Sequence, residues 1–345
     1  MSSAKGQRDK RDRSAITATP PQSFIDPPLT PPPTEEHQSA RVASILHTFR
    51  EIWCGQHAYL KPWTPLPLSY REYLHLQRAL EKDRHLDDFV HNKFRYDYDP
   101  YAQQLIIRMP SCLHERMVTQ LRTDIGRQLG DLIHSSAGGE GGRFAQGIAD
   151  AGSSTILFEP DTDVPVQARR EPDISFQHVD AKYPGVIIEV SYSQKMKDLP
   201  HLADDYLLGS DGSIRAMVGL NVEYHGSKKA TISVWRPAYV EGEEGKLEFQ
   251  AVQTVQEEVI RNEDGTPSNT SVGLRLELQD FAHNELINAR LTEQRNRLIP
   301  ISITPAALCE FLANAERFAR GPNTSSVSIE STVRAGVKKR RLTKR

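Results

Sequence analysis

The feature that most constrains the fold is an apolar run, Val186-Ile187-Ile188, which ends in the carboxylate of Glu189. A run without a polar face predicts a strand that is buried on both sides in the centre of a sheet. Other strand-like runs surround it and helical patterns lie between them, an order that favours an α/β sheet over a sandwich. The predicted strands are 103–109, 155–159, 164–168, 173–177, 185–191, 216–224 and 230–236.

Helical spacing of apolar residues is strongest over 113–134, where Ser111 is the expected N-cap. A capping box of Ser69 and Glu72 opens another helix, and Thr304 is the expected cap of the last one. The Pro-rich segment 61–67 is predicted to be a link, and the Gly-rich segment 138–142 is predicted to be a flexible loop. The remaining predictions are helices over 40–53, 69–82, 199–208 and 305–320 and a further strand region over 245–300.

The two ends of the chain differ in composition from its centre. Residues 1–38 are rich in Pro, Ser and Thr and are expected to form a disordered arm. A folded domain is then assigned to 39–300, a C-terminal helix to 301–321 and a disordered basic tail to 322–345. Within that tail Lys338, Lys339, Arg340 and Arg341 suit a nuclear-import signal or a phosphate-binding segment, and a merely solvated terminus is the alternative.

Bulk properties narrow the class of protein. The formal net charge of −2 does not fit a strongly basic nucleic-acid coat. Three scattered cysteines, Cys54, Cys112 and Cys309, indicate neither a disulfide framework nor a zinc cluster. No apolar stretch approaches the ~18 residues that a membrane span requires. We therefore expect a soluble intracellular protein of the nucleus or cytoplasm that does not bind membranes.

Chemistry is expected where two carboxylates end neighbouring strands. Asp173 opens one strand and Glu189 closes the central one, and buried carboxylates are costly unless a cation compensates them. Mg²⁺ or Mn²⁺ would suit such oxygen ligands and would support phosphodiester hydrolysis. Lys195 or Lys197 could then contact the phosphate, with Gln194 as a neutral hydrogen-bonding group. Motifs of dinucleotide-binding proteins, P-loop proteins and serine hydrolases are absent from the sequence.

The order and spacing of several short motifs resemble the Uma-two family of restriction-endonuclease-like proteins, within the PD-(D/E)XK nuclease superfamily. The similarity covers roughly residues 68–240. Its parts are the helix from Leu68 to Leu74, the hairpin that ends in Met109-Pro110, His114, Glu171-Pro172-Asp173, Glu189-Val190-Ser191-Tyr192-Ser193, Asp198 and Tyr206.

This resemblance implies a mixed sheet flanked by helices, a divalent metal at Asp173, Glu189 and Val190, and hydrolysis of nucleic acid, expected to be DNA. It also implies a role for Glu115 as an additional acidic residue, whereas the macrodipole of the helix explains a Glu there equally well. Ser191 stands where the superfamily motif has a Lys. The alternative function is therefore a catalytically inactive nuclease-like fold that binds nucleic acid or protein. A homodimer and an import receptor bound to the basic tail are further expected partners.

Overall fold

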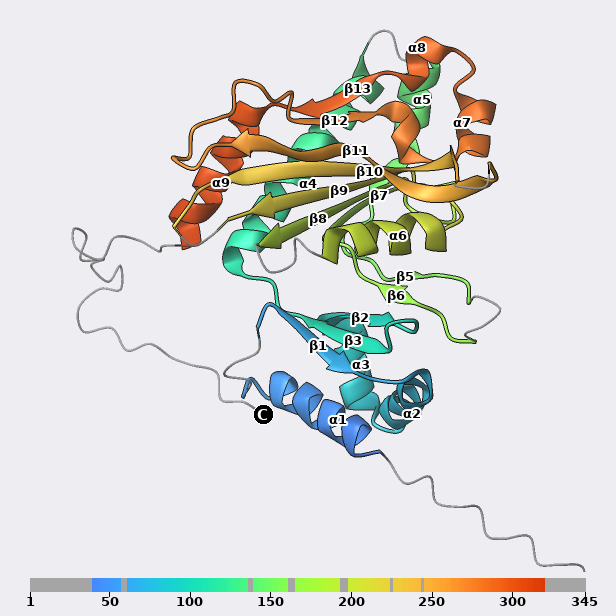
Figure 1. The fold of residues 1–345 in the computed structure, drawn as a ribbon, viewed down its shortest axis with the longest axis vertical. Helices are drawn as coiled ribbons and strands as arrows, with labels where there is room; N and C mark the ends of the chain where they lie inside the picture. Colours follow the sequence, from blue (N-terminus) through green and yellow to red (C-terminus); the bar gives the residue numbers. More distant parts are fainter. Residues whose placement is uncertain are drawn as a thin grey trace, which may run out of the picture.

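Two sheets meet in the middle of the molecule, and helices cover their outer faces (Figure 1). The computed structural model describes residues 39–56, 61–135, 139–160, 165–192, 198–223, 226–242 and 245–319. The predicted Pro-rich arm and basic tail lie outside these ranges.

The larger sheet has six strands and confirms the predicted α/β class. The central strand β8 pairs antiparallel with β7 and parallel with β9, so the sheet is mixed. Helix α4 (Cys112–His134) packs on one face and α6 (Leu199–Gly209) on the other. In spatial order the strands are β11 (Leu247–Arg261), β10 (Ala230–Glu241), β9 (Ala216–Val222), β8 (Val186–Tyr192), β7 (Ile174–His178) and β4 (Ile148–Asp150).

Strand β8 is buried on both faces, as its sequence predicts. Ile188 packs in the same apolar cluster as residues of α4, and Ile187 packs in the cluster that contains residues of α6. Because side chains alternate along a strand, Glu189 faces the same side as Ile187, which is the side of α6.

The smaller sheet has five strands, and three helices cover one of its faces. Its strand β2 reads Arg-Tyr-Asp-Tyr-Asp, so its two faces differ. Tyr96 and Tyr98 belong to the apolar cluster formed with the helices, whereas Arg95 and Asp97 contribute to a charged network on the other face. The elements are β1 (Trp63–Pro67), β3 (Gln104–Arg108), β2 (Arg95–Asp99), β6 (Arg169–Arg170), β5 (Ile156–Leu157), α1 (Ala40–Trp53), α2 (Tyr70–Glu81) and α3 (Arg84–Lys93).

The C-terminal elements complete the layer around α4. Leu308 and Leu312 of α9 share the apolar cluster of α4, and the predicted cap Thr304 accepts a hydrogen bond from the Ala307 amide at 3.3 Å. The elements are α5 (Glu140–Gln146), β12 (Leu274–Glu277), the 3₁₀ helix η3 (Leu278–Phe281), α7 (Asn284–Arg290), α8 (Gln294–Arg297), β13 (Pro300–Ile303) and α9 (Pro305–Ala319).

Several local predictions are confirmed. Ser111 caps α4, and both hydrogen bonds of the capping box between Ser69 and Glu72 form at the start of α2. Others are wrong. The Pro-rich link over 61–67 is an edge strand, β1, a position that tolerates Pro because one side of the strand needs no donors. Over 165–168 there is no strand; the pairing begins at Arg169.

The predicted Gly-rich loop is also wrong, because α5 begins at Glu140. Gly141 and Gly142 are buried, and a Cβ atom on Gly141 would lie 2.7 Å from Ile299. Glycine there allows the end of the Ile299 side chain to pack closely against the helix. The region 245–300 holds β11 and β12 as well as the helical elements η3, α7 and α8. Strands β2 and β4 and helix α3 have no counterpart in the sequence prediction.

The close approach of Gly185 to η3 generates a stability prediction. A Cβ atom on Gly185 would lie 2.0 Å from the carbonyl carbon of Phe281, and backbone cannot yield as a side chain does. Gly185→Ala should lower the free energy of unfolding by about 3 kcal/mol or more in urea denaturation. Gly126→Ala is the control, because the space around Gly126 in α4 is open; it should raise stability by up to about 1 kcal/mol. Equal effects of the two changes would contradict the packing argument.

Candidate functional site

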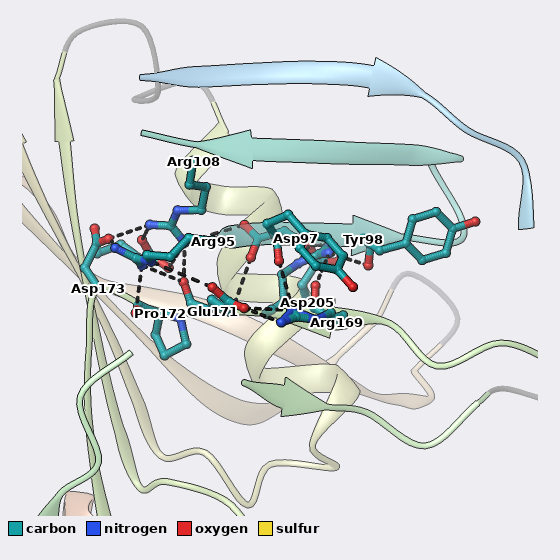
Figure 2. A network of polar contacts seen from close by, with 12 residues as sticks. Arg95, Asp97, Tyr98, Arg108, Arg169, Glu171, Pro172, Asp173 and Asp205 are labelled. Carbon is teal, nitrogen blue, oxygen red and sulfur yellow. Dashed lines mark hydrogen bonds and ion pairs between the residues drawn. The ribbon is translucent and has the colours of Figure 1, made fainter. Parts of the chain in front are cut away.

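The two sheets are joined by a buried network of charged residues (Figure 2). The chain leaves the smaller sheet at β6, passes through Glu171-Pro172-Asp173 and enters the larger sheet at β7. Strands β2 and β3 bring guanidinium and carboxylate groups to the same joint. The candidate site is therefore the joint itself.

Asp173 and Glu189 lie side by side on neighbouring strands. Ile174 pairs with Ile188 in the antiparallel ladder, so one further step places Asp173 opposite Glu189. Both side chains are buried, with 2% and 0% of their residue surface exposed. The sequence therefore predicted correctly that these two carboxylates would come together.

Arg108 of β3 bridges the two carboxylates. Its Nη2 atom lies 2.5 Å from Oδ1 of Asp173 and 2.9 Å from Oε2 of Glu189, so both oxygens face one cationic nitrogen. Its Nη1 atom donates to the Glu171 carbonyl oxygen and lies 3.5 Å from Oδ2 of Asp97. Burial would lower the pKa of Arg108, but the surrounding carboxylates, Asp173 first, raise it well above its ordinary value. The guanidinium therefore stays charged.

Other donors fix the orientation of Asp173. Its Oδ2 atom accepts from the Val190 amide at 2.8 Å and lies 3.0 Å from Nε2 of His114. The Nη2 atom of Arg95 donates to Oδ1 of Asp173 at 3.1 Å. The same nitrogen also donates to the Glu171 and Pro172 carbonyl oxygens. Burial would lower the pKa of His114, but the charge of Asp173 and its hydrogen bond outweigh burial and raise it.

Glu189 is held from the side of α6. The Tyr206 hydroxyl donates to Oε1 at 2.7 Å. Burial first, and the charge of Glu189 second, raise the pKa of Tyr206 well above its ordinary value, so the hydroxyl keeps the proton that it donates. Each of the four carboxylate oxygens of the pair thus accepts a hydrogen bond from the protein.

The network contains more carboxylates than guanidinium groups. Ion pairs link five carboxylates, three guanidinium groups and His114, with a formal charge of −2, or −1 with His114 protonated. The pKa of Glu171 is raised, by burial first and by the neighbouring charge of Asp97 as well, against the opposing effect of Arg169. The members are Asp97, Glu115, Glu171, Asp173, Glu189, Arg95, Arg108, Arg169 and His114. Beside them Arg170 pairs with Asp99 and Asp205 in a second group, and it donates to the Arg169 carbonyl oxygen.

The pair meets the basic requirements of a hard divalent cation. Mg²⁺ is typically bound by one or two carboxylates and keeps several waters, and here two carboxylate oxygens face one position in a site of excess negative charge. Across the residues that the structure describes there is no group of three or more His, Cys, Asp or Glu side chains that could hold a metal. The position between Asp173 and Glu189 is taken by Nη2 of Arg108, so an ion could bind only if that guanidinium withdrew.

The other predicted site residues are placed as follows. Val190 contacts Asp173 through its amide, a donor, whereas a metal ligand would have to be its carbonyl oxygen. Glu115 lies on α4 at the rim, half-exposed, with Oε1 3.5 Å from Nδ1 of His114. Gln194, Lys195 and Lys197 lie outside the described residues, and so do Lys338, Lys339, Arg340 and Arg341.

Sequence reasoning missed Arg108 and Arg95, which are the guanidinium groups nearest to the pair within the described structure. Arg95 and Arg108 are directly opposite each other in the ladder of β2 and β3. Their signal was the alternation of charged and aromatic residues in Arg95-Tyr-Asp-Tyr-Asp99, which predicts a strand with one polar and one apolar face. That pattern does not reveal which carboxylates the polar face will meet.

The bond from Tyr206 to Glu189 generates a second prediction. Tyr206→Phe leaves a buried carboxylate without one donor and should lower the free energy of unfolding by about 2 kcal/mol in urea denaturation. Tyr98→Phe is the matched control. Tyr98 is equally buried, but its hydroxyl donates to the neutral Leu68 carbonyl oxygen, so its loss should lower the free energy of unfolding by only about 1 kcal/mol. A loss from Tyr206→Phe no greater than that from Tyr98→Phe would contradict the charge-assisted bond.

The sequence matches neither the models of known protein families nor the curated proteins with which it was compared. Among the described helices, none combines the length and the apolar character that crossing a membrane would require. What is known of this site therefore comes from its own geometry.

Proposed function

We propose that the chain is a metal-dependent nuclease of the PD-(D/E)XK type that hydrolyses phosphodiester bonds in nucleic acid, with DNA as the expected substrate. One observation carries the proposal: oxygens of Asp173 and Glu189 face a single cation position in a buried network with an excess of carboxylates. The strand positions of this pair are also those on which the resemblance to the Uma-two family depends.

In this proposal Asp173 and Glu189 hold Mg²⁺ or Mn²⁺. Such an ion, when bound, lowers the pKa of a water molecule and stabilises charge on phosphate oxygens. Tyr206, His114 and the Val190 amide keep the carboxylates in place, as hydrogen-bonding partners behind metal ligands generally do.

Arg95 is the described cation best placed to contact substrate. Its side chain is partly exposed, at 19%, and lies 3.1 Å from Asp173. A guanidinium at the rim of the site can bind a phosphate oxygen of an incoming strand. Glu115, half-exposed beside His114, lies at the same rim.

A specific observation favours a second candidate, a nuclease-like fold without catalysis. All four oxygens of the carboxylate pair accept hydrogen bonds from the protein, and Arg108 stands between the two groups. On this alternative the pair only joins the two sheets, and the chain acts by binding nucleic acid or protein at another surface.

Cleavage of supercoiled plasmid separates the two candidates. The full chain with Mg²⁺ or Mn²⁺ should nick the plasmid. Asp173→Asn and Glu189→Gln should each reduce the cleavage rate by more than about 100-fold, because mutation of residues that merely support metal ligands already lowers activity ~10–100-fold. Asp150→Asn, which changes an exposed carboxylate paired with Arg122, is the control and should retain the rate. Nucleic-acid binding that is equal with and without metal, together with no cleavage, would instead establish the second candidate.

A further inference from the structure

Arg108 is the cation of the carboxylate pair, and it comes from the opposite sheet. One nitrogen, Nη2, lies within 2.9 Å of an oxygen of both Asp173 and Glu189, and the residue is only 5% exposed. A divalent ion bound to the same two oxygens would occupy the space of that nitrogen. Two cations cannot share the position, because their repulsion is strong in a buried site.

We propose that the Arg108 guanidinium holds the position of the divalent ion in the metal-free protein, and that metal binding and withdrawal of this guanidinium are one exchange. This inference rests on the metal site of the proposed function. It adds that the chain carries an internal competitor for its own metal.

The structure provides partners for a withdrawn guanidinium. Oδ2 of Asp97 already lies 3.5 Å from Nη1, and the Glu171 carbonyl oxygen accepts from the same nitrogen. The guanidinium carbon also lies 5.3 Å from the centre of the Trp63 ring, a distance suited to cation–π attraction. A small rotation of the side chain could therefore exchange the two carboxylates for acceptors that are already in contact.

Charge explains why the exchange would occur at all. With Arg108 in place the described residues of the ion-paired network still have a formal charge of −2, or −1 with protonated His114. Addition of a divalent ion while Arg108 stays within the network brings the total close to neutral. Among the residues that the structure describes, the guanidinium groups do not balance the carboxylates, which favours binding of a further cation.

Mn²⁺ binding to the full-length protein tests the exchange without reference to activity. Arg108→Met removes the competitor and should tighten Mn²⁺ binding by at least about tenfold, measured by the free-ion signal in electron paramagnetic resonance. Without metal this variant should melt below the wild type, and saturating Mn²⁺ should raise its Tm by about 5 °C or more, well above the rise in the wild type.

Two controls locate the effect. Arg170→Met removes another buried guanidinium from the neighbouring ion-paired group, where it pairs with Asp99 and Asp205. This change should lower the Tm, but the response to Mn²⁺ should equal that of the wild type. Combining Arg108→Met with Glu189→Gln removes one proposed ligand and should abolish the gain in Mn²⁺ affinity.

Arg108→Lys serves if Arg108→Met does not fold without metal. Its shorter side chain with one ammonium competes less well, so Mn²⁺ should bind more tightly than to the wild type. Binding by the Arg108 variants that is no tighter than in the wild type would overturn the exchange. Plasmid cleavage tests the nuclease separately. If the Arg108 variants bind Mn²⁺ more tightly but the wild type does not cleave, the nuclease is rejected and the exchange is supported. If the wild type cleaves but the variants bind Mn²⁺ no more tightly, the exchange is rejected and the nuclease is supported.

Discussion

The bridge from Arg108 to Asp173 and Glu189 determines how the two sheets fit together. The apolar core is divided between a cluster beneath α1, α2 and α3 and clusters on the two faces of the larger sheet. Charged groups fill the joint between these parts. Loss of one partner of a buried ion pair typically costs about 3–5 kcal/mol, since the other charge stays buried and uncompensated. The sheets are therefore held in register at this joint by complementary charge as well as by apolar contact.

A purely structural joint would not need this composition. Buried ion pairs contribute little net stability compared with apolar side chains of similar size, because desolvation offsets most of their attraction. The excess of carboxylates over guanidinium groups makes the joint less favourable still. Burial first, and the charge of Asp97 as well, raise the pKa of Glu171. The proposed metal site would account for such a charge balance, since a cation bound there would compensate the excess.

Short-range patterns revealed the carboxylate pair but not its cation. Glu189 could be found because it ends an apolar run, and Asp173 because it opens the adjacent strand; both facts depend on a few neighbouring residues. Arg108 becomes part of the site only when β2 and β3 pair and their polar face docks on the larger sheet, a contact between segments more than sixty residues apart. The start of α5 was missed for a similar reason, since the buried Gly141 packs against Ile299, a residue far away in the sequence.

The identity of Ser191 gives this arrangement a further consequence. Ser191 lies two positions after Glu189 on β8, is buried, and donates through Oγ to Oδ1 of Asn221 on β9 at 3.3 Å. It contributes no charge where the superfamily motif would place a lysine. The positive charge nearest to Glu189 in the described structure comes instead from β3, on the other sheet. A cation on the same strand would be present however the sheets were arranged, whereas Arg108 reaches the pair only when the sheets are docked. In this chain, the contribution of Arg108 to compensating the buried carboxylates therefore depends on docking of the two sheets.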